Sequence, residues 1–289
     1  MRSIAIEAAE TGARATAPAA AARTARMART TGTARTPRRA AFLALALMSA
    51  GAFPAPVFGQ AAGGQPSAAA LLERVDANEV YSSIAYEGEM AIEYQGKRFV
   101  KRFKAFARGG SESFIEFTNP EDAGTKYLKR EGRLYVYSPD AEEVMLISGH
   151  LLKESMMGSD LSYEDTIENE KLSVRYEPSL AGQEEASGRL AYVLDLRARR
   201  SGESYPRQKL WIDAQTGDLL RAEYYALSGA KLKEYALLRA ETIGGRRFPV
   251  ESEMRDLLRK GSRTVFRMSA VRLDAPIPDE TFSVRNLER

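Results

Sequence analysis

The sequence predicts a mainly β protein, built on one curved antiparallel sheet of about eleven strands with two helical pieces covering it. Three observations support this fold class. Apolar and polar residues alternate through most of the chain after Ser82, which is typical of strands with one buried and one solvated face. Turn dipeptides that favour hairpins separate these segments. Two segments lack the alternation, residues 68–75 and 148–170, and they are the expected covers.

The first 60 residues are predicted to be an N-terminal extension that contains a secretory signal peptide. They hold eight arginines, no lysine and two acidic residues, and an apolar run over residues 40–52 precedes several small residues. That order is typical of a signal peptide, and the run is shorter than the roughly 20 residues that span a bilayer. A mitochondrial presequence is the competing interpretation. Export would place the protein in the periplasm, soluble after signal cleavage.

The rest of the chain is mildly acidic, which argues against a nucleic-acid partner. Residues 61–289 hold 34 of the 42 basic residues and 37 of the 39 acidic ones, although the whole chain carries +3. Both signs are interspersed, as on an ordinary soluble surface. The basic character therefore belongs to the N-terminal extension. The chain has no cysteine, so its core must be held by burial alone.

Residues 61–70 are predicted to form a linker that runs into the first helix. The stretch "GQAAGGQPS" has the composition of a flexible linker, and Ser67 at its end can cap a helix. Ala68, Leu71, Leu72 and Val75 follow at the spacing of one apolar helical stripe. We therefore expect this helix to cover one part of the sheet.

The strands and hairpins come next. In "AYEGEMAIEY" and "LAYVLDLRA", as in "FPVESEMRD" and "TVFRMSA", apolar residues occupy every second position. The expected hairpin turns are Gln95-Gly96, Glu131-Gly132, Thr216-Gly217-Asp218, Ser228-Gly229 and Gly244-Gly245. The inward faces of the strands are predicted to bind a ligand. These candidate cavity residues are Met90, Ile92, Phe99, Phe103, Tyr192, Leu194, Leu196, Val250 and Met254.

The stretch "SMMGSDLSYED" (residues 155–165) is predicted to be a broken helical flap. Met156 and Met157 offer flexible apolar side chains, and Gly158 permits a turn of the backbone. Ser162 and Asp165 have the spacing of a capping box, with Asp in place of Glu. Two interpretations remain open: a loop that plugs the end of a barrel, and a flap that contacts cargo.

No catalytic, metal or cofactor motif is found in the sequence. The chain has one histidine, His150, and no cysteine, and it lacks a G-x-S-x-G elbow. Zinc requires several His or Cys ligands, and no EF-hand spacing, P-loop or dinucleotide fingerprint occurs. We therefore expect a protein that is not an enzyme and uses neither a metal nor a cofactor.

Four blocks in order resemble the outer-membrane lipoprotein-sorting protein family, the LolA-like carriers. They are "NPEDAGTKYLKREGRLYVYSP", "SMMGSDLSYED", "LWIDAQTGDLLRAEYYALSGAKLKEY" and "PDETFSVRNLER". The resemblance implies a LolA-like domain over residues 71–289, in which an incomplete, half-open β-barrel encloses an apolar cavity under helical lids. No key residue of the carrier aligns onto a motif of this sequence.

The resemblance also implies a function. A LolA-like protein would bind the acyl chains of a lipoprotein or lipid and pass them between membranes or to an exporter. Its partners would be that cargo, an inner-membrane transporter or exporter and an outer-membrane acceptor, and we expect a monomer with no nucleic-acid partner. The alternative is an envelope sensor module that detects mislocalised lipoproteins.

Overall fold

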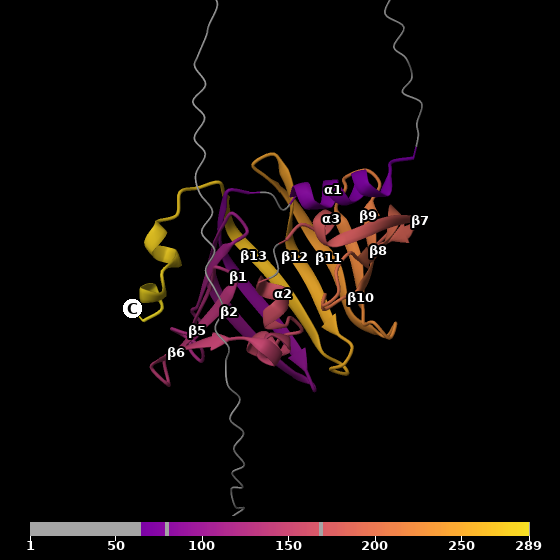
Figure 1. Cartoon of the computed structure of the whole chain (residues 1–289). Helices are drawn as coiled ribbons and strands as arrows, with labels where there is room; N and C mark the ends of the chain where they lie inside the picture. Colours follow the sequence, from indigo (N-terminus) through magenta and orange to yellow (C-terminus); the bar gives the residue numbers. More distant parts are fainter. Residues whose placement is uncertain (1–64, 79–80, 168–169, 289) are drawn as a thin grey trace, which may run out of the picture. The chain divides into compact units, whose positions relative to one another are not determined.

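The computed structural model describes residues 65–78, 81–167 and 170–288, which form one antiparallel sheet with short helices (Figure 1). The thirteen strands are β1 (Ser83–Tyr94), β2 (Lys97–Arg108), β3 (Glu112–Phe117), β4 (Lys126–Arg130), β5 (Arg133–Ser138), β6 (Glu143–Ile147), β7 (Tyr176–Ala186), β8 (Arg189–Ala198), β9 (Arg207–Asp213), β10 (Leu219–Tyr225), β11 (Lys231–Ile243), β12 (Arg246–Asp256) and β13 (Arg263–Leu273). The α-helices are α1 (Ala68–Asn78), α2 (Tyr163–Ile167) and α3 (Leu172–Arg175), and the 3-10 turns are η1 (Gly149–Lys153), η2 (Met156–Gly158), η3 (Asp279–Phe282) and η4 (Val284–Asn286).

Two meanders make up the sheet and meet where the first strand pairs with the last. The order is β6-β5-β4-β3-β2-β1-β13-β12-β11-β10-β9-β8-β7. Gly88 of β1 lies opposite Met268 of β13, which joins the meanders. Within the described residues β6 and β7 each pair with one neighbour only, so the sheet is not closed. The predicted class, a single antiparallel sheet with short helices, is confirmed, but the predicted count of about eleven strands is wrong.

One part of the sheet is buried on both faces. Phe282 and Leu287, in the C-terminal segment that holds η3 and η4, are both 0% exposed and pack against Phe114 and Leu128. The opposite face of the same strands packs into another core cluster through Tyr127. Four of the five residues of β4 are therefore buried, and the alternation that marks a strand in the sequence is lost.

All five predicted turns connect adjacent strands. Gln95 and Gly96 link β1 to β2 with φ of 51° and 72°, and Glu131 and Gly132 link β4 to β5 with φ of 53° and 71°. Positive φ at both central positions is the geometry of a type I′ hairpin turn, and glycine adopts it without a steric penalty. These short turns fix the register of the strands that follow.

The helix predicted after Ser67 covers one end of the sheet. The Ser67 hydroxyl accepts a hydrogen bond from the Ala70 amide (3.1 Å), which confirms the predicted cap. Leu71 and Leu72 of α1 are fully buried in a core cluster with β7, β8, β9 and β10. We call the face of the sheet that carries α1, α2 and α3 the inner face (Figure 1).

The predicted flap forms a second cover, at the other end of the inner face. Met156 is 3% exposed and packs in a core cluster with Met90, Phe103 and Tyr127. Met157 has a φ of 52°, and the Tyr127 hydroxyl donates a hydrogen bond to its sulfur (3.0 Å). Met156 thus packs as a plug would. Whether the segment contacts cargo stays a prediction.

The capping box is confirmed at the start of α2. The Ser162 amide donates to Asp165 Oδ2 (2.8 Å), and the Asp165 amide donates to Ser162 Oγ (3.2 Å). Asp160, 1% exposed, fastens the same segment to the sheet, because its carboxylate accepts hydrogen bonds from the Thr264 hydroxyl (2.6 Å) and the Asp256 amide (2.9 Å). Residues 155–165 are therefore positioned by polar contacts as well as by Met156.

The predicted signal peptide, within residues 1–60, lies outside the described residues, as does the start of the linker. Among the residues that the structure does describe, no helix is long and apolar enough to cross a membrane.

Replacing Met156 with alanine is expected to lower the free energy of unfolding by about 2–5 kcal/mol, because it leaves a void in a packed core. Urea denaturation measures this loss. Leu151→Ala is the control: Leu151 belongs to the neighbouring η1 and is 41% exposed, so its truncation should cost far less. Equal midpoints for Met156→Ala and wild type would show that Met156 does not plug the sheet.

Candidate functional site

Two adjoining cavities lie on the inner face between the two covers. Their volumes are about 590 Å³ and about 320 Å³, within the range of about 300–1,000 Å³ that ligand sites occupy. The larger cavity extends from α3 to α2 across strands β9 to β13. The two cavities have five wall residues in common: Leu219, Tyr224, Pro249, Met254 and Met268.

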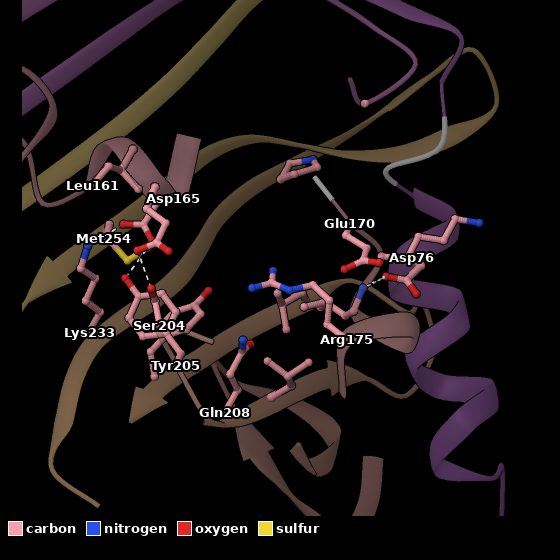
Figure 2. A pocket seen from close by; sticks show the side chains of 18 of the residues that line it. Asp76, Leu161, Asp165, Glu170, Arg175, Ser204, Tyr205, Gln208, Lys233 and Met254 are labelled. Atoms are coloured by element: carbon pink, nitrogen blue, oxygen red, sulfur yellow. Dashed lines mark hydrogen bonds and ion pairs between the residues drawn. The ribbon is translucent and has the colours of Figure 1, made fainter. Parts of the chain in front are cut away.

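The cavities are apolar along the sheet and polar at the rim of the larger one. The wall of the smaller cavity includes Val75 of α1, Leu237 and Phe266, together with the Asp218–Arg247 ion pair. Figure 2 shows the polar rim, to which α1, α2 and α3 each contribute. Its charged members are Asp76, Glu164, Asp165, Glu170, Lys171, Arg175 and Lys233. A long apolar ligand with a polar end matches this distribution.

Asp165 of α2 is the centre of the rim's hydrogen-bond network. Lys233 Nζ donates to Asp165 Oδ2 (2.5 Å), and the Tyr205 hydroxyl donates to Asp165 Oδ1 (2.7 Å). Burial of Asp165 opposes its ionisation, but the charge of Lys233 and the hydrogen bonds from Lys233, Ser162 and Tyr205 outweigh burial. The pKa of Asp165 is therefore held below its usual value. Burial, together with the charge of Asp165, raises the pKa of the Tyr205 hydroxyl, which stays protonated and able to donate.

Several other rim charges also have protein partners. Arg175 donates from Nε to Glu203 (3.0 Å), and Arg200 pairs with Glu170 (2.6 Å). The two carboxylate oxygens of Asp76 accept hydrogen bonds from the first two amides of α3, at 2.9 and 3.0 Å. The rim charges thus hold the covers in place.

Gln208 of β9 differs from these residues. It is 3% exposed, and it shares the inner face with Leu210 and Ile212, which follow at alternate positions. Figure 2 shows its amide directed into the cavity between Tyr205 and Arg175. Among the residues that the structure describes, the amide has no hydrogen-bond partner. The sequence contained a signal for this residue, because a polar group stands at an apolar position of "RQKLWID". Gln208 was nevertheless not among the predicted cavity residues.

The nine predicted cavity residues all lie on the inner face, but of these only Met254 lines the cavities described here. Tyr192, Leu194 and Leu196 belong to the cluster covered by α1. The others lie elsewhere: Met90, Ile92 and Phe103 pack in the cluster that contains Met156, Val250 packs with Ile84, and Phe99 is 46% exposed. The covers fill the two ends of the inner face and leave the middle open.

The predicted flap residues lie outside both cavity walls. Met156, Met157 and Gly158 do not border either cavity, whereas Leu161, Glu164 and Asp165 of the same segment border the larger one. The contribution of this segment to the cavity therefore comes from the residues after Gly158. A role for Met156, Met157 and Gly158 in binding cargo remains a prediction.

The described part of the chain contains no group of three or more His, Cys, Asp or Glu side chains placed to hold a metal ion. His150 is exposed at the start of η1. The cavity can therefore bind a ligand through apolar contacts and hydrogen bonds.

Comparison with known proteins identifies the family and the fold. A family model described as "-like: Uncharacterized protein" matches residues 109–289. The structure of a DUF1329 family protein from Desulfovibrio piger is 30% identical, with a TM-score of 0.70 over 76% of this chain and 97% of the other. No curated protein matches the chain.

Two further structures share the fold. An outer membrane lipoprotein-sorting protein domain from Vibrio parahaemolyticus is 19% identical, with a TM-score of 0.67 over 75% of this chain and 98% of that one. A LolA superfamily protein from Nitrosomonas europaea is 22% identical, with a TM-score of 0.64 over 77% of this chain and 100% of the other. The chain therefore belongs to the DUF1329 family, and its fold is the LolA-like fold of outer-membrane lipoprotein-sorting proteins that the sequence resemblance predicted.

Proposed function

We propose that the protein is a periplasmic, non-enzymatic carrier that binds acyl chains of a lipoprotein or lipid and passes them between membranes or to an exporter. The observation that carries this proposal is the pair of adjoining cavities on the inner face of a LolA-like sheet. An acyl chain fits the apolar walls, and its polar end fits the rim. The cavity residues that we propose as contacts are Leu219, Tyr224, Met254 and Met268, which line both cavities.

The magnitude of acyl burial requires a means of release. Each buried methylene contributes about 0.8 kcal/mol, so fifteen of them would contribute roughly 12 kcal/mol before costs. Binding of that strength gives very slow dissociation. A carrier therefore needs a wall that can move and an acceptor that takes over the cargo.

The wall that we propose to move is α2. It borders the larger cavity through Glu164 and Asp165, and polar contacts to Lys233, Tyr205 and Ser204 fasten it to the sheet side. A wall held by a few polar contacts can open locally at a lower free energy than one held by a packed core. Met156, at the other end of the segment, would stay in the core while α2 moves.

Charge in the cavity is expected to prevent binding. Met254→Glu places a carboxylate in the wall shared by both cavities, at a half-buried position outside the packed core clusters. Burying that charge against an acyl chain is costly, so the affinity for a pyrene-labelled palmitate methyl ester should fall at least about 100-fold. Fluorescence titration measures the affinity, and circular dichroism checks the fold.

Met145→Glu is the matched control, because Met145 lies on the edge strand β6 and is 45% exposed. It should bind the probe like wild type. If Met254→Glu folds and keeps wild-type affinity, the cavities are not the acyl site.

Asp165→Asn is expected to weaken the fastening of α2. Because the pKa of Asp165 is lowered in the folded state, its ionised form stabilises the protein above the ordinary aspartate pKa of about 3.9, and this contribution disappears as the pH falls through the lowered value. The variant should be less stable than wild type at pH 7, and the difference should shrink toward pH 3. Urea midpoints across a pH series measure it.

The control is Asp140→Asn, because Asp140 is an exposed turn residue. Its urea midpoints should match those of wild type across the pH series. In stopped-flow measurements at pH 7, probe dissociation should be faster from Asp165→Asn than from Asp140→Asn. Equal dissociation rates would argue against α2 as the moving wall.

A further inference from the structure

We propose that Gln208 is the polar anchor of the cavity and binds the carbonyl oxygen of an uncharged acyl ester, in preference to the carboxylate of a free fatty acid. This inference rests on the proposed function and specifies the chemical class of its cargo. Gln208 is one of the wall residues of the larger cavity, and Figure 2 shows its amide pointing into it.

The first argument is the state of the amide in the protein alone. A primary amide can donate two hydrogen bonds and accept two. Gln208 is 3% exposed, yet its amide finds no partner among the described residues. Its neighbours across the sheet on the inner face are Leu196 and Tyr224. Because the amide faces the cavity, its donors and acceptor are available to a ligand there.

The second argument is the position of Gln208 relative to the apolar walls. Leu210 follows it on the inner face of β9, and Tyr224 beside it borders both cavities. An acyl chain whose carbonyl lies at Gln208 can extend past Leu219 and Met254 toward the smaller cavity, which has Leu237 in its wall. The amide therefore lies where the polar end of an acyl ligand would meet its apolar tail.

The third argument is charge. The cations nearest to this end of the cavity are already paired, Lys233 with Asp165 and Arg175 with Glu203. The charged lining residues comprise four carboxylates and three cations. A free fatty acid would bring another negative charge to a rim where carboxylates already outnumber cations, whereas an ester carbonyl needs only a donor. The two N–H groups of Gln208 supply that donor.

The test compares ligands that share one chain length. The methyl ester of palmitic acid, the matched alkyl methyl ether and palmitate compete with the pyrene-labelled ester for the wild-type protein, for Gln208→Leu and for Gln208→Glu. Leucine keeps the size of the side chain, and glutamate removes the amide donor. One net hydrogen bond corresponds to about two- to tenfold in affinity.

We expect wild type to bind the ester about fivefold or more tightly than the ether, and palmitate more weakly than the ester. Both variants should lose the preference for the ester over the ether, while Gln208→Leu keeps wild-type affinity for the ether. Gln208→Leu should also unfold at the same urea concentration as wild type or a higher one. Gln183→Leu is the control, because Gln183 is exposed on β7.

Three results would overturn the inference. If Gln208→Leu keeps the wild-type preference for the ester over the ether, the amide does not contact the carbonyl. That result would leave the proposed carrier function uncontradicted. A parallel loss of ester and ether affinity, or a fall in stability, would give Gln208 a structural role. No competition by either ligand in wild type would contradict the proposed function itself, and this inference with it.

Two further competitors distinguish the sources of the ester, a diacylglyceryl lipopeptide and a short-chain phosphatidylethanolamine. Competition by either one that weakens in Gln208→Leu supports the inference and identifies the source. Competition by both that is unchanged in Gln208→Leu contradicts it.

Discussion

The unclosed sheet is the constraint on which the rest of the structure depends. A closed barrel buries its interior with its own strands, but here β6 and β7 each pair with one neighbour within the described residues. The apolar inner face must therefore be covered by other segments. α1 covers one end through Leu71 and Leu72, and Met156 covers the other. The cavities lie in the middle of the inner face, between these covers.

Buried carboxylates position the covers around the cavities. Asp76 joins α1 to α3, and Asp160 and Asp165 join the mid-chain segment to the sheet. Each carboxylate loses solvation on burial and is compensated by hydrogen bonds that only one arrangement of the covers provides. Polar fastening gives a defined closed position, and opening α2 breaks these hydrogen bonds together with the contact between Tyr163 and Tyr127. That combination suits a wall that must stay shut over cargo and still release it.

Gln208 and the rim illustrate how such a site departs from what stability alone favours. A leucine at position 208 would continue the apolar stripe of Leu210 and Ile212 on the inner face. An amide there suits the binding of an acyl ester that we propose. Local rules are commonly broken at functional sites for this reason.

The sequence by itself determined the features that depend on neighbouring residues. The period-two alternation, the hairpin at Gln95-Gly96, the Ser67 cap and the Ser162–Asp165 capping box all follow from contacts within a few positions, and the structure contains each of them. The same alternation assigned the nine candidate residues to the inner face, because a strand of known register has only two faces.

Only the tertiary structure decided which part of that face stays open. Leu194 and Met254 have the same periodicity in the sequence, but α1 covers Leu194 while Met254 borders the cavities. The outcome depends on where segments distant in the chain come to rest, as Met156 does on Phe103 and Phe282 on Leu128. Such contacts also bury both faces of β4 and leave Gln208 without a partner among the described residues. The sequence does not reveal these features, because packing between distant segments leaves no periodic pattern in either segment.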